Sequence, residues 1–249
     1  GGGDISYVYE WQKSLNGSSW NGLGVYGPAI QPVNLTTSTY YRLSAISSFV
    51  CGPIYSDPVY IEVYTPLESG VITSSQDICY GTVSDELNFE VGPTGADGDY
   101  TYLWEQSLNG FDYSDANMYN ASINYQSEFL FESFYYRVQV TSNYGCGTEV
   151  TTPVFVNVYD EFITGEITPI ETICFGEVPN GIQMNDSPSG AGFDFSYQWF
   201  ASTNGNGFSI ISGETSINHY PNALFDTTYY KLMINSNLGC GSLETNVCE

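Results

Sequence analysis

Apolar and polar residues alternate along several stretches of the chain. Tyr41, Leu43 and Ala45 alternate with more polar neighbours, and valines occupy every second position from 154 to 158. A period of two is typical of a strand that rests one face on a core. No stretch has the apolar spacing of a helix, and turns rich in Gly and Asn separate the strands. The pattern predicts an all-β protein built of antiparallel sandwiches.

The same landmarks return along the chain at a nearly constant step. Trp11 and Trp104 are 93 residues apart, and Trp104 and Trp199 are 95 residues apart. A pair of tyrosines follows each of these tryptophans, and a cysteine beside glycine follows each pair. A fixed period decides the architecture before any local assignment. We therefore expect a structural core at Trp11, Trp104, Trp199, Tyr41, Tyr136 and Tyr230.

The period divides the chain into three domains of one type. Residues 1–65 form an incomplete repeat that lacks the first strands, 66–160 a complete repeat, and 161–249 a repeat whose last strand is truncated. The short junctions carry an apolar residue at the same place, Leu67 and Phe162, which favours packing between neighbouring repeats. We expect a semi-rigid rod of roughly 100 Å, since a sandwich strand spans about 30 Å.

Charge excludes two classes of partner. The chain has 28 acidic and 4 basic residues, which give a formal net charge of −24. This charge repels the phosphates of nucleic acids and anionic lipid head groups. The 42% hydrophobic and 16% aromatic content indicates a folded protein. No apolar run is long enough to cross a bilayer, so we expect no direct membrane insertion.

Five of the six cysteines recur at the repeat period, and none of the six has the spacing of a zinc site, which favours disulfides in an oxidising compartment. Two pairings compete. Within repeats, Cys79 joins Cys146 and Cys174 joins Cys240. Between repeats, Cys51 joins Cys79, Cys146 joins Cys174, and Cys240 is left to meet Cys248. We favour the pairing within repeats, because the turn with Cys146 is expected at the end of its repeat that lies away from the next one.

Three of the four basic residues, Arg42, Arg137 and Lys231, occupy one repeat position. They are either a periodic ligand contact or outward charges paired with acidic neighbours, such as Glu10 beside Arg42 or Glu105 beside Arg137. The structural alternative is favoured, because pairs of opposite charge on adjacent strands stabilise sheets.

No residue is a convincing catalytic or cofactor ligand. His219 is the only histidine, and its equivalents are Ile30 and Tyr125, so it is a poor candidate for a catalytic base. The acidic loop at residues 97–99 is a weak calcium candidate that lacks the spacing of a calcium hand. Trp20 and the many tyrosines are a candidate sugar-stacking surface, although most tyrosines are expected in the sandwich. We expect no catalytic site, no cofactor and no metal.

A Trp on the third strand and a Tyr at the base of the sixth resemble the immunoglobulin and fibronectin-type sandwich. The combination of Ile-Cys-x-Gly, Tyr-x-Trp, Thr-Tyr-Tyr-(Arg/Lys) and Gly-Cys-Gly resembles the Ig-like or PKD-like repeats of giant surface proteins of Bacteroidota. Among these are gliding-motility adhesins of the SprB type. The resemblance implies export by the type IX system and display outside the outer membrane. Residues 226–228 resemble the Bacteroidota O-glycosylation pattern, which makes Thr227 a candidate glycosylation site.

These features predict a non-enzymatic, extracellular stalk segment of a bacterial surface adhesin that serves attachment or gliding motility. Its expected partners are neighbouring repeats and, through many weak contacts, surface glycans or other adhesive surfaces. One alternative is a spacer or carbohydrate-binding array of a secreted glycoside hydrolase. Another is a phage or filament subunit in which chains donate a strand to one another.

Overall fold

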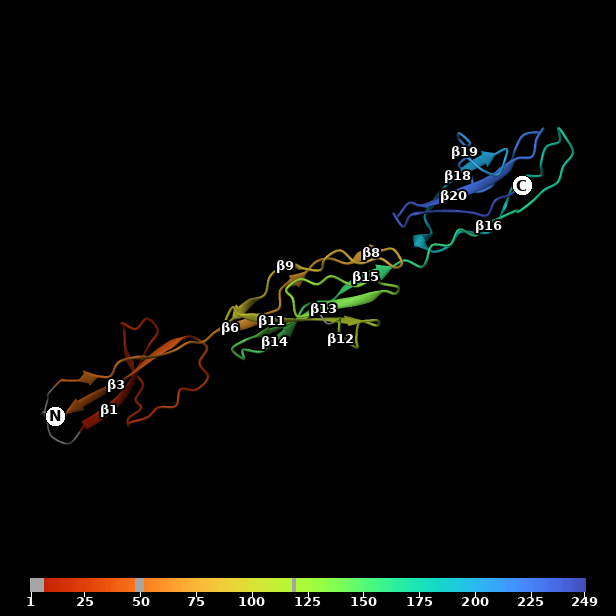
Figure 1. Cartoon of the computed structure of the whole chain (residues 1–249). Coiled ribbons are helices and arrows are strands. Elements are labelled where there is room, and N and C mark those ends of the chain that lie inside the picture. The colour runs from red at the N-terminus through yellow and green to blue at the C-terminus, as the bar shows by residue number, and fades with distance from the viewer. Residues whose placement is uncertain (1–6, 48–51, 118–119) are drawn as a thin grey trace. The chain divides into compact units, whose positions relative to one another are not determined.

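A computed structural model describes residues 7–47, 52–117 and 120–249 of the chain, and these residues form β-strands, turns and one short 3-10 segment, η1 (Ala191–Phe193) (Figure 1). The predicted all-β fold is confirmed. The chain divides into two compact units, which comprise residues 1–69, 93–101 and 140–149, and residues 70–92, 102–139 and 150–249. These units do not coincide with the three predicted repeats, because the second repeat contributes residues to both.

The first unit holds a five-stranded antiparallel sheet in the order β2-β1-β3-β4, with β5 also paired to β3. Its strands are β1 (Tyr7–Ser14), β2 (Asn21–Gly22), β3 (Thr39–Ser47), β4 (Ile54–Tyr55) and β5 (Val59–Ile61). A separate antiparallel ribbon joins β6 (Thr65–Glu68) to β10 (Thr94–Ala96). The strands β1 to β5 of the first repeat thus all belong to one sheet.

The second repeat has a six-stranded sheet in the order β12-β11-β13-β15-β8, with β14 paired to β13. Its strands are β8 (Gln76–Ile78), β11 (Tyr100–Ser107), β12 (Ser114–Asp115), β13 (Phe134–Ser142), β14 (Thr148–Val150) and β15 (Val154–Val158). A second, two-stranded sheet pairs β7 (Val71–Ile72) with β9 (Phe89–Val91).

The third repeat, which lies in the second unit, has the same plan. Its main sheet runs β19-β18-β20-β21 and a two-stranded sheet pairs β16 with β17. These strands are β16 (Glu166–Ile167), β17 (Met184–Asp186), β18 (Phe195–Ser202), β19 (Ser209–Ile210), β20 (Tyr229–Ser236) and β21 (Ser242–Glu244). The long antiparallel pair β18–β20 places Trp199 opposite Leu232.

One pairing departs from the predicted antiparallel arrangement. β8 runs parallel to β15, with Gln76 opposite Val156 and Ile78 opposite Val158. Because the two strands run in the same direction, the residue that follows β8 lies beside the end of β15. This places Cys79 at the end of the second repeat from which the chain continues into the third.

The predicted core residues are buried, with one exception. Buried side chains include Tyr41, Trp104, Tyr136, Trp199 and Tyr230. Trp104 and Trp199 have no exposed surface. Trp11 is only half-buried, because no second sheet covers β1 among the residues of the first repeat that the structure describes. The apolar positions of the first repeat's last strand are also open, and Val59 is 62% exposed whereas Val156 of β15 is fully buried.

The predicted Asn-Gly turns connect the strands by a common mechanism. In the second repeat, Asn109 Oδ1 accepts hydrogen bonds from the backbone N–H groups of Phe111 and Asp112 at 2.8 and 2.9 Å. Gly110 adopts a φ of 76°, a left-handed conformation that favours glycine. The side-chain amide of Asn16 accepts the same type of bond in the first repeat, and that of Asn204 does so in the third.

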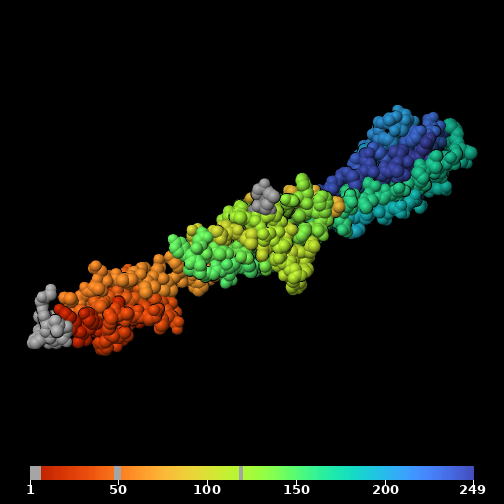
Figure 2. Space-filling model, turned by 60° about the horizontal axis from the view of Figure 1, so that its bottom comes forward, coloured from red at the N-terminus to blue at the C-terminus, as the bar shows by residue number. Residues whose placement is uncertain are grey.

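Within the third repeat, segments from its beginning and its end lie side by side. Ile167 N donates to Asn246 Oδ1 at 2.8 Å, and Asn246 Nδ2 donates back to Ile167 O at 3.0 Å. Glu171 N donates to Glu249 O at 3.0 Å. The teal and dark-blue surfaces of this repeat adjoin in Figure 2 for this reason. The pairing positions the loop that carries Cys174.

Candidate functional site

The predicted charge pairs are present in the second and third repeats. Arg137 Nε donates to Glu105 Oε2 at 2.7 Å, as predicted, and its guanidinium lies 3.7 Å from the centroid of the Tyr113 ring. Burial raises the pKa of Tyr113, although the nearby guanidinium opposes this. Lys231 Nζ donates to both carboxylate oxygens of Glu244 at 2.7 and 2.8 Å. These contacts occupy the cations within their own sheets and support the structural interpretation.

The predicted partner of Arg42 was wrong. The register places Gln12, and not Glu10, opposite Arg42, and Arg42 Nε donates to Gln12 Oε1 at 2.8 Å. The guanidinium lies 4.2 Å from the centroid of Trp20 and 3.8 Å from that of Tyr55. One face of Trp20 is therefore covered by a cation, and that face is closed to a sugar ring.

His219 has a packing role that its repeat position explains. Its ring lies 5.4 Å from Trp199 and 5.2 Å from Tyr230. Tyr125 stands between the equivalent rings of the second repeat at 5.7 and 5.4 Å. His219 Nδ1 also lies 3.0 Å from Glu214 Oε2. The histidine thus replaces a core tyrosine.

The acidic loop proposed as a weak calcium candidate stabilises a turn. Asp97 accepts hydrogen bonds from Ser142 Oγ and from the backbone N–H of Tyr144. Asp99 O accepts a bond of 3.0 Å from Asn143 N. Across residues 7–47, 52–117 and 120–249, no group of three or more His, Cys, Asp or Glu side chains is placed to hold a metal ion.

The cysteines do not form the pairs that we favoured. A disulfide joins Cys79 of the second repeat to Cys240 of the third, with a Cα–Cα distance of 5.4 Å and a sequence separation of 161 residues. Cys146 and Cys174 are exposed and free, and Cys248 is buried and free. Both predicted bonds within repeats, Cys79–Cys146 and Cys174–Cys240, are therefore wrong. The alternative bonds Cys146–Cys174 and Cys240–Cys248 are absent as well, and Cys51 lies outside the described residues.

Strand direction explains the error. Cys79 follows β8 and lies beside the end of β15, which pairs with the first residues of β13. Cys146 lies in the turn after the other end of β13, a strand of nine residues. Such a strand spans roughly 26 Å, whereas a disulfide needs Cα atoms within about 7 Å. Cys79 therefore meets the Gly-Cys-Gly turn of the following repeat.

Aromatic side chains flank the bonded cysteine. Tyr80 packs edge-on against Phe131, with ring centroids 5.1 Å apart. The turn is closed by a 2.8 Å bond from Gly81 N to Leu130 O. Sequence reasoning missed this contact. The signal was available, because a Phe precedes the second Tyr of the pair by five residues in both later repeats.

The candidate glycosylation site, Thr227, is exposed and lies in a loop before β20. It lines a pocket together with Cys174, Phe175 and Phe225. The hydroxyl is therefore accessible, and modification there stays a prediction. No helix among the described residues has the length and apolar character needed to cross a bilayer.

Comparison with known proteins identifies the family. The model of a family described as a domain of unknown function (DUF8696) matches residues 1–65, 68–160 and 163–249. The chain therefore belongs to this family and carries three copies of its domain. A search of curated proteins found no match.

Solved structures with several β-rich domains show weak similarity. Three N-terminal domains of the bacteriophage RB49 Highly Immunogenic Outer Capsid protein (Hoc) match at 13% identity and a TM-score of 0.45, over 99% of this chain and 90% of that one. Domains A168–A170 of titin match at 14% identity and a TM-score of 0.46, over 84% and 73%. The insect immune protein hemolin matches at 12% identity and a TM-score of 0.39, over 98% and 67%. Similarities this low assign no function.

Proposed function

We propose that the chain is an extracellular stalk segment of a large bacterial surface adhesin, in which tandem domains hold adhesive parts away from the cell. The observation that carries the proposal is the Cys79–Cys240 disulfide between successive repeats. A bond of this kind couples two neighbouring domains covalently. It therefore limits their separation when the chain is pulled, which suits a load-bearing tether.

The charge of the chain supports a role outside the cytoplasm and away from nucleic acid. A net charge of −24 keeps an array of domains soluble and self-repelling. Disulfides persist mainly in oxidising environments such as the cell surface. Export by the type IX system and a part in gliding motility are the finer forms of this proposal, and they derive from the resemblance of the repeated motifs.

The proposed role is not enzymatic. His219 and Asp97, the residues with the most chemical promise in the sequence, make structural contacts within their own repeats. Contacts with surface glycans or other adhesive surfaces, if each repeat offers one, gain strength from repetition. The proposed partners are thus neighbouring repeats and a surface bound at many weak points.

Cell labelling and deletion test this function. Antibodies raised against the chain should label intact cells of the producing bacterium, and deletion of the segment should reduce attachment or gliding. A matched strain with Cys146→Ser, which leaves the Cys79–Cys240 bond in place, should behave as the parent. Labelling that appears only after lysis, or unchanged attachment and gliding after deletion, would contradict the proposal.

A further inference from the structure

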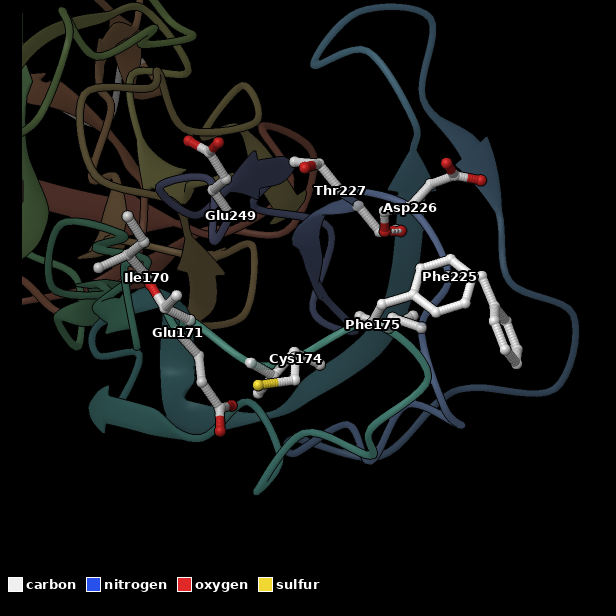
Figure 3. A pocket seen from close by; sticks show the side chains of 12 residues that line it. Ile170, Glu171, Cys174, Phe175, Phe225, Asp226, Thr227 and Glu249 are labelled. Atoms are coloured by element: carbon white, nitrogen blue, oxygen red, sulfur yellow. Dashed lines mark hydrogen bonds between the residues drawn. The ribbon is translucent and has the colours of Figure 1, made fainter.

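We propose that the exposed pocket around Cys174 is a docking site for the Gly-Cys-Gly turn of a further copy of this domain, with which Cys174 forms a disulfide. The site lies in the third repeat, at the position that Cys79 occupies in the second (Figure 3). This inference concerns how the domains assemble, and it is independent of the proposed adhesive role.

The loop around free Cys174 has the same structure as the loop around bonded Cys79. Gly176 N donates to Leu224 O at 2.8 Å, and Gly81 N donates to Leu130 O at the same distance. Phe175 packs edge-on against Phe225 with centroids 5.3 Å apart and an interplanar angle of 76°. The equivalent rings beside Cys79 are 5.1 Å apart at 73°. The receiving loop is thus already in its bonded conformation.

What differs is the cover over the loop. Tyr80, beside Cys79, lines a pocket together with Cys240 and Gly241, and it is 40% exposed. Phe175, the equivalent residue beside Cys174, is 81% exposed. It borders an open pocket of about 390 Å³, where Figure 3 shows the Cys174 thiol together with Phe175 and Phe225. In the second repeat, the surface around Cys79 is covered by the Cys240 turn of the third repeat. The equivalent surface around Cys174 in the third repeat is open.

The turn that would dock is also preformed. In the turn with bonded Cys240, Ser236 N donates to Gly241 O at 3.0 Å. In the turn with free Cys146, Ser142 N donates to Gly147 O at 3.1 Å. The turn keeps one conformation whether or not its cysteine is bonded, so little ordering opposes docking.

Charge is compatible with this occupant. The pocket around Cys174 carries the carboxylates of Glu171, Asp226 and Glu249. A turn with the sequence of residues 237–243, Asn-Leu-Gly-Cys-Gly-Ser-Leu, has no charged side chain. The turn therefore approaches these carboxylates without like-charge repulsion. An acidic segment of this protein would be repelled by them.

The bond forms by ordinary thiol–disulfide chemistry. The Cys174 thiol and the thiol of the docked turn each lose a proton, and one S–S bond forms between the two sulfurs. The two electrons pass to a disulfide oxidant, such as oxidised glutathione, which is cleaved to two thiols by the same two protons and two electrons. No metal or other cofactor takes part in this exchange.

An extended chain tests the proposal directly. Tyr230 faces Cys248 as Tyr136 faces Val154, so Glu249 corresponds to Phe155. Residues 156–249, with Cys174→Ser in the appended copy only, are therefore appended directly after Glu249, and the chain is oxidised with glutathione disulfide and mapped without reduction. We expect a peptide that joins Cys174 to Cys240 of the appended copy. A Cys174 that stays free, or that bonds another cysteine, would overturn the proposal, and the Cys79–Cys240 peptide in the same digest reports correct folding.

A second measurement uses the unextended chain and does not depend on folding of an added domain. A peptide of residues 235–243, with its cysteine activated by thiopyridine, is reacted with the chain, and activated glutathione serves as the reference. Relative to this reference, we expect the peptide to favour Cys174 over Cys146 by at least about fivefold, equivalent to about 1 kcal/mol of docking free energy. Equal preference for the two exposed thiols would overturn the proposal.

Discussion

The disulfide between repeats makes a quantitative mechanical prediction. When the chain is pulled by its ends and its domains unfold, the residues between Cys79 and Cys240 stay closed in a loop. The bond closes a sequence separation of 161 residues. At about 3.4 Å per extended residue, this loop withholds roughly 550 Å of contour length. A chain-entropy estimate for a loop of this size also gives a stabilisation of up to about 5 kcal/mol.

Single-molecule stretching with optical tweezers measures this length. The contour length of the fully unfolded chain should be roughly 550 Å shorter when the chain is oxidised than when it is reduced. Cys240→Ser should give the long extension with and without reductant, because its bond is absent. Cys146→Ser is the matched control, since it alters the equivalent turn of the second repeat and leaves the bond intact. Equal contour lengths for the oxidised and reduced chains would refute the reasoning.

Four further predictions test the core, the charges and the arrangement of repeats. Trp104→Ala should lower the unfolding free energy of its repeat by about 3–5 kcal/mol in chemical denaturation, and Trp11→Ala should lower it by less because Trp11 is only half-buried; equal losses would contradict the burial argument. Burial raises the pKa of Tyr125 to about 12, so its contribution to stability is complete below pH 10 and should fall by about 1.4 kcal/mol per pH unit between pH 10 and 12; the Tyr125→Phe variant should lack this part of the pH dependence in alkaline denaturation. A double-mutant cycle with Arg137→Met and Glu105→Gln should give a coupling of about 1 kcal/mol, and a value near zero would deny the pair a stabilising role. Small-angle scattering should show an elongated particle, and a compact globule would contradict the predicted rod.

The periodic features of the sequence predicted most of the local structure. The alternating stretch around Val156 forms β15, and the recurring tryptophans of the two later repeats, Trp104 and Trp199, are buried as their recurrence suggested. The Arg137–Glu105 pair followed from their positions on adjacent strands. These features depend on neighbours within one sheet, which periodicity and strand register describe well.

The cysteine pairing could not be predicted in the same way. It depends on which end of a repeat each cysteine occupies, and this is set by the parallel pairing of β8 with β15. Alternation along a strand predicts which side chains face the core, but it does not predict whether the neighbouring strand runs parallel or antiparallel. The lower burial of Trp11 has a similar cause, since the second sheet that covers the later tryptophans is absent from the described part of the first repeat.

The most direct test of the account is non-reducing peptide mapping of the unmodified, oxidised chain. The account predicts a peptide that joins Cys79 to Cys240, with Cys146 and Cys174 recovered as alkylated free thiols. A digest that instead contains Cys79 joined to Cys146, or Cys146 joined to Cys174, would contradict the covalent link between the second and third repeats.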